Sequence, residues 1–333
     1  MTTYLLREGH SVRVDALPIA IRVQPVGGGP FGHRVEVAGQ HGPVRTVRRP
    51  DQVIVPVIDQ PVQVSLLPEG EAFGPQSVVT VALGPDSPAG GDADRAVLDQ
   101  VDLSGLHRRD IVIMEPDAGR IKISTVGVVN DEALPPTAEM ARDAARGVLG
   151  LPRLPAERRV RLAVGLDTSA SMRRLPPDRL VRPCLELFAG LSVVIAGDQT
   201  GHGTLVGWQS VPVPTGPAAE FASSMITGLA DRPLDIGCRS GLFEQSTAGP
   251  GADRTARFLI TDAVPPGLAG RTLTGVVVIG EAQPPGPLGG GATGVPVLSD
   301  DQPLDRDQVG RIVASLLAAA GPLIGAGNLI GTP

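Results

Sequence analysis

The sequence predicts a two-domain protein, with an all-β N-terminal half and an α/β C-terminal half. Up to about residue 128, short stretches alternate polar and apolar residues between Gly and Pro turns. From Arg161 onward, apolar runs alternate with helical patterns. Between them, residues 129–159 are rich in Pro and poor in bulky side chains, which is typical of a linker. We therefore expect a β-sandwich over residues 1–128, a linker with one short helix, an α/β domain over 160–321 and a tail over 322–333.

Composition limits the classes of function. The formal net charge is −6 and the arginines are scattered, which argues against a nucleic-acid partner bound through its phosphates. Cys184 and Cys238 form no Cys-x-x-Cys pair, so neither a disulfide framework nor a structural zinc site is expected. The first residues lack the basic and long apolar regions of a signal peptide, and no apolar stretch reaches about 18 residues. We expect a cytoplasmic protein with no membrane partner.

The predicted elements of the N-terminal half are short strands, several of which alternate polar and apolar residues. Alternation of this kind is typical of a strand with one face in the core. The strands are predicted at residues 11–15, 20–24, 52–58, 62–67, 78–83, 110–114 and 120–124.

The predicted elements of the C-terminal half follow a short linker helix at residues 138–147. Apolar runs of strand length alternate with longer helical patterns, and the run at 191–196 is interpreted as a buried strand. Residues 204–208 are expected to form an edge strand, joined to it by a hairpin across residues 201–203. Further strands are predicted at 161–167, 256–262, 273–279 and 295–298, and helices at 178–189, 217–229, 239–245 and from Asp305 or Asp307 to about 320.

The strand at 161–167 ends abruptly in a carboxylate and alternating hydroxyls: Asp167, Ser169 and Ser171. Open α/β sheets bind ligands at the carboxyl ends of their strands. Oxygen donors of this kind suit a small divalent cation, with Mg²⁺ keeping several waters. The alternative is a strand-to-helix loop in which Asp and Ser serve only as caps.

This stretch resembles the metal-ion-dependent adhesion site of von Willebrand factor type A domains, whose first motif is Asp-x-Ser-x-Ser. The resemblance implies a Rossmann-like sheet with one antiparallel edge. It also implies that Ser169 and Ser171 bind Mg²⁺ or Mn²⁺ directly, that Asp167 and Asp262 bind it through water, and that the metal is bridged to a carboxylate of a partner protein. Asp262 ends a second predicted strand, although it could instead cap the following turn.

The family also supplies a Thr from a loop before a helix, and this sequence has none in the matching stretch, residues 234–242. Cys238 or Ser240 would stand in for it. A thiol is a soft ligand and a poor partner for Mg²⁺, whereas a Ser hydroxyl could replace Thr chemically. The site is therefore complete, weakened or vestigial.

The N-terminal half resembles the TerD-like domains of tellurite-resistance and stress-response proteins. Its opening strands follow that family's order, and residues 86–96 resemble its acidic, Gly-rich calcium loop. The candidate ligands are Asp86, Asp92 and Asp94. Calcium takes six to eight oxygens, so three carboxylates beside Arg95 make a weak site, and a solvated acidic loop is the alternative. We expect no calcium there.

Signals for an enzyme are weak. The chain contains no P-loop and no Gly-x-Ser-x-Gly elbow, and residues 289–294 match Gly-x-Gly-x-x-Gly only in a loop leading into a strand. The two resemblances thus imply a non-enzymatic, cytosolic interaction adaptor, in a system of the bacterial stress-response or tellurite-resistance type. The alternatives are a metal-dependent phosphohydrolase that uses Asp167 and a structural assembly component with a vestigial metal site.

Overall fold

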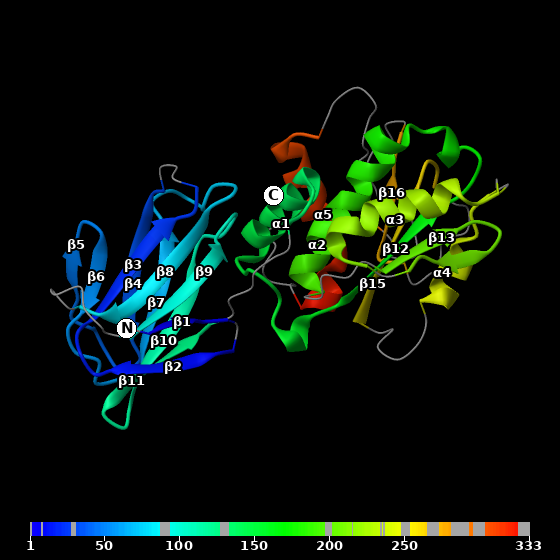
Figure 1. The fold of residues 1–333 in the computed structure, drawn as a ribbon. Helices are drawn as coiled ribbons and strands as arrows, with labels where there is room; N and C mark the ends of the chain where they lie inside the picture. The colour runs from blue at the N-terminus through cyan, green and yellow to red at the C-terminus, as the bar shows by residue number, and fades with distance from the viewer. Residues whose placement is uncertain are drawn as a thin grey trace. The chain divides into compact units, whose positions relative to one another are not determined.

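The chain divides into two compact units, Met1–Asp131 (unit 1) and Glu132–Pro333 (unit 2), which are described separately (Figure 1). The computed structural model is of mixed α/β type and contains several sheets. It describes residues 2–7, 9–27, 31–86, 94–126, 133–196, 202–214, 216–233, 235, 237–247, 254–264, 273–280, 293–295 and 304–325.

The described part of unit 1 consists of two sheets of short strands (Figure 1). The first has the order β1-β9-β8-β3-β6-β5 and the second the order β2-β11-β10-β7-β4. All strand pairs are antiparallel except β1 with β9. The strands are β1 Thr3–Leu5, β2 Ser11–Asp15, β3 Ile19–Pro25, β4 His33–Gly39, β5 Val47–Arg49, β6 Gln52–Val55, β7 Val62–Pro68, β8 Val78–Pro85, β9 Arg95–Asp102, β10 Arg109–Asp117 and β11 Arg120–Thr125.

The two sheets of unit 1 share one hydrophobic core. Alternate residues of β8, including Val79, Val81 and Leu83, are fully buried in the same cluster as Val64 and Leu66 of β7. All seven predicted strands are present, with small shifts at their ends. Strands β4 and β5 were not predicted, whereas β1 and β9 overlap the strands that only the TerD-like resemblance implied, at Leu5 and at residues 101–103.

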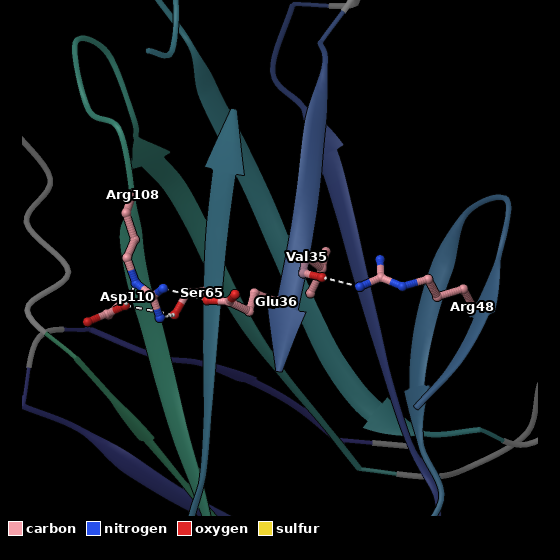
Figure 2. Close-up of polar contacts among 6 residues, drawn as sticks. All are labelled: Val35, Glu36, Arg48, Ser65, Arg108 and Asp110. Carbon is pink, nitrogen blue, oxygen red and sulfur yellow. Dashed lines mark hydrogen bonds and ion pairs between the residues drawn. The ribbon is translucent and has the colours of Figure 1, made fainter. Parts of the chain in front are cut away.

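A polar cluster crosses three strands on the second sheet of unit 1 (Figure 2). Arg108 forms ion pairs with Glu36 and with Asp110, the latter at 3.0 Å, and donates a 2.8 Å hydrogen bond to the Ser65 hydroxyl. Burial acts to raise the pKa of Asp110, but hydrogen bonds from Ser65 and Arg108 outweigh it, so the pKa lies below its ordinary value. Cross-strand pairs of this kind favour the observed register of β4, β7 and β10.

One hydrogen bond joins the edge strands of the two sheets. The guanidinium of Arg48, on β5, donates to the carbonyl oxygen of Val35, on β4, at 2.8 Å (Figure 2). Because β5 and β4 each end their sheet, this contact fastens the open side of unit 1.

Unit 2 contains a mainly parallel sheet with the order β14-β13-β12-β15-β16-β17 among the described residues. Only β14 runs antiparallel to its neighbour. Both faces of the sheet are covered, since Leu162, Val164 and Leu166 of β12 enter one apolar cluster and Ala163 enters another. The strands are β12 Arg161–Asp167, β13 His202–Val206, β14 Ser210–Pro212, β15 Thr255–Thr261, β16 Gly275–Val278 and β17 Thr293–Val295.

The helices of unit 2 divide between these two clusters. Residues of α1, α2, α3 and α5 enter the larger cluster, whereas Phe243 of α4 enters the smaller one. Asp305 caps α5 through a reciprocal pair of hydrogen bonds with Gln308, as one of the two predicted caps requires. No described helix is long and apolar enough to cross a bilayer. The helices are α1 Pro136–Leu149, α2 Arg182–Ile195, α3 Ala218–Ala230, α4 Ser240–Ser246 and α5 Arg306–Ile324.

The predicted strand at 191–196 is wrong, because α2 continues through this segment to Ile195. Helix α2 is buried on nearly all sides, and a helix of that kind has no polar face to reveal its period. In consequence β13 is not an edge strand. It lies parallel to β12 inside the sheet, and the antiparallel edge is β14, which follows it.

The segment expected to be a linker belongs to the core of unit 2. Helix α1 buries Ala138, Ala141, Ala145 and Leu149 in the same cluster as α2 and α5. These small side chains let the helices pack closely. In the sequence they were misread as a shortage of core residues, because core positions are more often filled by bulky side chains. The last helix also extends beyond the expected end near residue 320, through Pro322 to Ile324.

The contact between α1 and α2 depends on Gly190. A Cβ added there would overlap the carbonyl oxygen of Ala138 and lie 2.9 Å from the backbone nitrogen of Arg142. We predict that Gly190→Ala destabilises unit 2 by at least about 1–3 kcal/mol, since backbone atoms cannot yield as side chains do. Urea unfolding followed by helical circular dichroism measures the change.

The matched control is Gly310→Ala on α5, where a Cβ meets nothing within 4 Å. This variant should be neutral or more stable by up to about 1 kcal/mol, from helix propensity alone. Equal effects of the two substitutions would contradict the close approach of α1 and α2.

Candidate functional site at the strand ends

Two neighbouring strands of unit 2 end in carboxylates. Asp167 is the last residue of β12, and Asp262 directly follows the last residue of β15. The two strands are parallel, and Leu166 pairs with Ile260, which brings Asp167 level with Thr261. The sequence-predicted residues Asp167 and Asp262 therefore lie together at one edge of the sheet.

The carboxylate of Asp167 is buried and held by the protein on both sides. Its side chain is 3 % exposed; Oδ1 accepts the backbone N–H of Ser169 and Oδ2 accepts the hydroxyl of Thr261, each at 2.7 Å. Burial raises the pKa of Asp167 and the nearby charge of Asp262 adds to it, so together they outweigh these hydrogen bonds. A cation at this position would relieve both costs.

Ser169 and Ser171 follow Asp167 in the loop after β12, and their hydroxyls lie side by side. Their Oγ atoms are 3.1 Å apart, and either one can be the donor. Ser169 is buried and Ser171 is exposed, while the next residue, Met172, is 1 % exposed and anchors the loop in the core. One residue of the pair, Ser169, is therefore buried in the protein, and the other, Ser171, is accessible to solvent.

A second loop is fastened to this one through Asp235. The hydroxyl of Thr168 donates to Asp235 Oδ2 at 2.7 Å, and the N–H of Ala170 donates to the Asp235 carbonyl at 3.1 Å. The sequence interpretation gave Thr168, Asp235 and Thr261 no role. Thr168 and Thr261 are polar residues at buried positions and Asp235 is half-buried, which becomes visible only in the folded structure.

Cys238 and Ser240, the two residues expected to stand in for a loop Thr, differ in their environment. Burial raises the pKa of the half-buried Cys238 thiol, and the charges of Asp167 and Asp262 raise it further. A thiol is also a soft ligand that suits Mg²⁺ poorly. Ser240 is 5 % exposed and opens α4, so its hydroxyl is the chemically suitable candidate.

The acidic loop of unit 1 offers carboxylates that are already engaged. Asp94 accepts hydrogen bonds from the Thr2 N–H at 3.1 Å and the Tyr4 hydroxyl at 3.3 Å. Asp86 accepts one from Gln52 at 3.4 Å and lies 3.5 Å from an Arg49 nitrogen. The third candidate, Asp92, lies outside the described residues.

Comparison with known proteins assigns no family. No family model matches the chain, and no curated protein matches it. Among the residues that the structure describes, no group of three or more His, Cys, Asp and Glu side chains could hold a metal ion. The chemistry of the strand ends thus depends on two carboxylates supplemented by hydroxyls.

The raised pKa of Asp167 predicts a pH-dependent loss of stability. Above the unfolded value of about 3.9, the unfolded chain releases this proton first, so stability falls as pH rises toward the folded pKa. Asp167→Asn should flatten that slope. The amide can accept from Ser169 and donate to Thr261, whose hydroxyl then donates to the Ala263 carbonyl, 2.9 Å away.

Urea unfolding between about pH 4 and pH 7 in EDTA tests this expectation. Asp231→Asn, which removes an exposed carboxylate at the end of α3, is the control and should keep the wild-type slope. An Asp167→Asn slope equal to that of the wild type would show that Asp167 ionises normally.

For the acidic loop, we predict no rise in melting temperature with millimolar Ca²⁺, because Asp86 and Asp94 already accept protein donors. Differential scanning fluorimetry of the wild type and of Asp92→Ala measures it. A clear rise that disappears in Asp92→Ala would reveal a calcium site.

Proposed function

We propose that the chain is a cytosolic protein-interaction adaptor whose unit 2 is a von Willebrand A-like domain. Its strand-end site would hold Mg²⁺ or Mn²⁺, and the metal would bind a carboxylate of a partner protein. The observation that carries this proposal is the pair of hydroxyls of Ser169 and Ser171, 3.1 Å apart at the end of β12.

The spacing of these hydroxyls supports octahedral magnesium. Mg²⁺ binds oxygens at about 2.0–2.1 Å in near-ideal octahedral geometry, so adjacent ligand oxygens lie about 2.9 Å apart. The Oγ atoms of Ser169 and Ser171 need only a small adjustment to reach that separation. Asp167, whose two oxygens already accept hydrogen bonds, fits a role through water rather than a direct one.

The remaining positions around such a metal have suitable candidates. Asp262 is partly exposed and lies near enough to raise the pKa of Asp167, so its carboxylate can hold a metal-bound water. Ser240 offers the loop hydroxyl. The metal would supply a point of attachment for a partner carboxylate, and the exposure of Ser171 and Asp262 leaves that side open to a partner.

A phosphohydrolase that uses Asp167 fits less well. A nucleophilic carboxylate must be reached by its substrate, and Asp167 is 3 % exposed with one hydrogen bond on each oxygen, from Ser169 and Thr261. The neighbouring acid, Asp235, accepts the hydroxyl of Thr168 and so serves the loop. These bonds favour binding over catalysis.

For unit 1 we propose a β-sandwich of the TerD-like kind, which would place the adaptor in a stress-response or tellurite-resistance type system. Two sheets around one core support the sandwich.

The proposal predicts that Mg²⁺ stabilises unit 2. At a hundredfold excess of Mg²⁺ over its dissociation constant, the free energy of unfolding should rise by about 2.7 kcal/mol. Ser169→Ala should weaken this response, and it should cost the metal-free protein about 1 kcal/mol, because the buried hydroxyl bonds to Ser171 and helps to stabilise the Asp167 carboxylate. Asp167→Asn should remove most of the response. Urea unfolding with and without Mg²⁺, together with isothermal titration, measures these effects.

Ser315→Ala on α5 is the matched control for the loss of a hydroxyl and should respond to Mg²⁺ as the wild type does. If Mg²⁺ and Mn²⁺ show no binding up to several millimolar, the metal-dependent adaptor is wrong. Unit 2 would then act through its surface alone, as the vestigial-site alternative expects.

A further inference from the structure

The only Trp in the chain forms an exposed stack with an Arg. Trp208 lies in the turn between β13 and β14 and is 60 % exposed. The guanidinium carbon of Arg239 lies 3.4 Å from the centre of its ring. An exposed aromatic ring covered by a cation is held in one orientation, since the stack restricts both side chains.

The fold places this stack next to the candidate metal site. Gly207, which precedes Trp208, lies so close to Thr168 and Asp235 that a Cβ would overlap both side chains. The N–H of Arg239 donates to the carbonyl of Gly207 at 3.2 Å, which joins the two loops. In the sequence, Arg239 stands between Cys238 and the candidate ligand Ser240. Cys238 lies near enough to the carboxylates at the strand ends for their charge to raise its pKa.

The guanidinium of Arg239 has no hydrogen bond or ion pair with the residues that the structure describes. Arg173, which also borders the strand ends, instead donates to the carbonyls of Ala230 and Arg232. Stacking covers the face of the Arg239 guanidinium and leaves its N–H edges available in plane. That geometry suits bidentate binding of a carboxylate.

We propose that Trp208 and Arg239 bind a second carboxylate of the partner, beside the one on the metal. The partner segment is therefore an acidic peptide stretch with two nearby Asp or Glu side chains. One carboxylate completes the coordination of the metal, and the other pairs with Arg239, while Trp208 packs against the segment. This inference rests on the proposed metal-dependent adaptor and adds which partners it selects.

The experiment is selection from a random dodecapeptide display library in Mg²⁺, with elution by EDTA. Peptides selected by the wild type should carry two acidic residues at a fixed spacing. Peptides selected by Arg239→Gln should keep one acid and lose the second. Because Trp208 is the only Trp, its fluorescence then reports the affinity of a synthesised peptide at this site.

For a selected peptide, replacing the second acid by its amide should weaken binding to the wild type by roughly tenfold. The same replacement should leave binding to Arg239→Gln unchanged. Arg161→Gln, which removes an exposed charge at the opposite end of β12, is the matched control and should retain the wild-type preference.

EDTA-eluted peptides with a single acid, or the same motif from Arg239→Gln, would overturn this inference and leave the metal-dependent adaptor standing. If no peptide elutes with EDTA although Mg²⁺ binds, the two-carboxylate partner is also wrong. If Mg²⁺ itself does not bind, the proposed function fails, and this inference fails with it.

Discussion

The carboxylate of Asp167, buried at the end of β12, is the constraint on which the strand-end site depends. A charged oxygen in that position is costly unless hydrogen bonds or a cation compensate for it. The protein supplies two donors, the Ser169 N–H and the Thr261 hydroxyl, which come from the loop after β12 and from β15. The carboxylate therefore joins two strands and fixes the conformation of the loop that carries the serine hydroxyls.

The surrounding loops are positioned by the same requirement for buried polar groups to find partners. Thr168 and Ala170 bind the side chain and backbone of Asp235, and the backbone of Gly207 binds that of Arg239. Three segments far apart in the sequence thus converge beside the strand ends. The loop of the proposed metal site and the loop that carries the Trp208 stack are consequently joined through Asp235 and Gly207.

Much of the fold could be predicted from periodicity, and the errors have physical causes. Seven strands of unit 1 and the helices α3, α4 and α5 were predicted within a few residues; the strands show alternation and α5 has the Asp305 cap. The end of α2 was misread because an apolar run buried on all sides lacks a period. Helix α1 was assigned to a linker because its core residues are mostly Ala.

For the site, the sequence revealed residues that share one short motif but not those contributed by other loops. Asp167, Ser169 and Ser171 follow one another along the chain, and Asp262 ends a recognisable strand. Asp235 and Arg239 are ordinary surface residue types in a linear sequence. Their roles depend on a glycine, Gly207, whose lack of a side chain allows two loops to touch. Such information exists only in three dimensions.

The burial of α1 also has a consequence for how this protein can be divided and recombined. An exchangeable module must carry every helix that covers its own core, and α1 covers α2 and α5. A fragment that begins at β12 would leave an apolar face of those helices in water, inviting self-association. The boundary of the second module therefore lies before Pro136. A recombination event nearer to β12 would produce a C-terminal fragment that aggregates instead of folding as an independent domain.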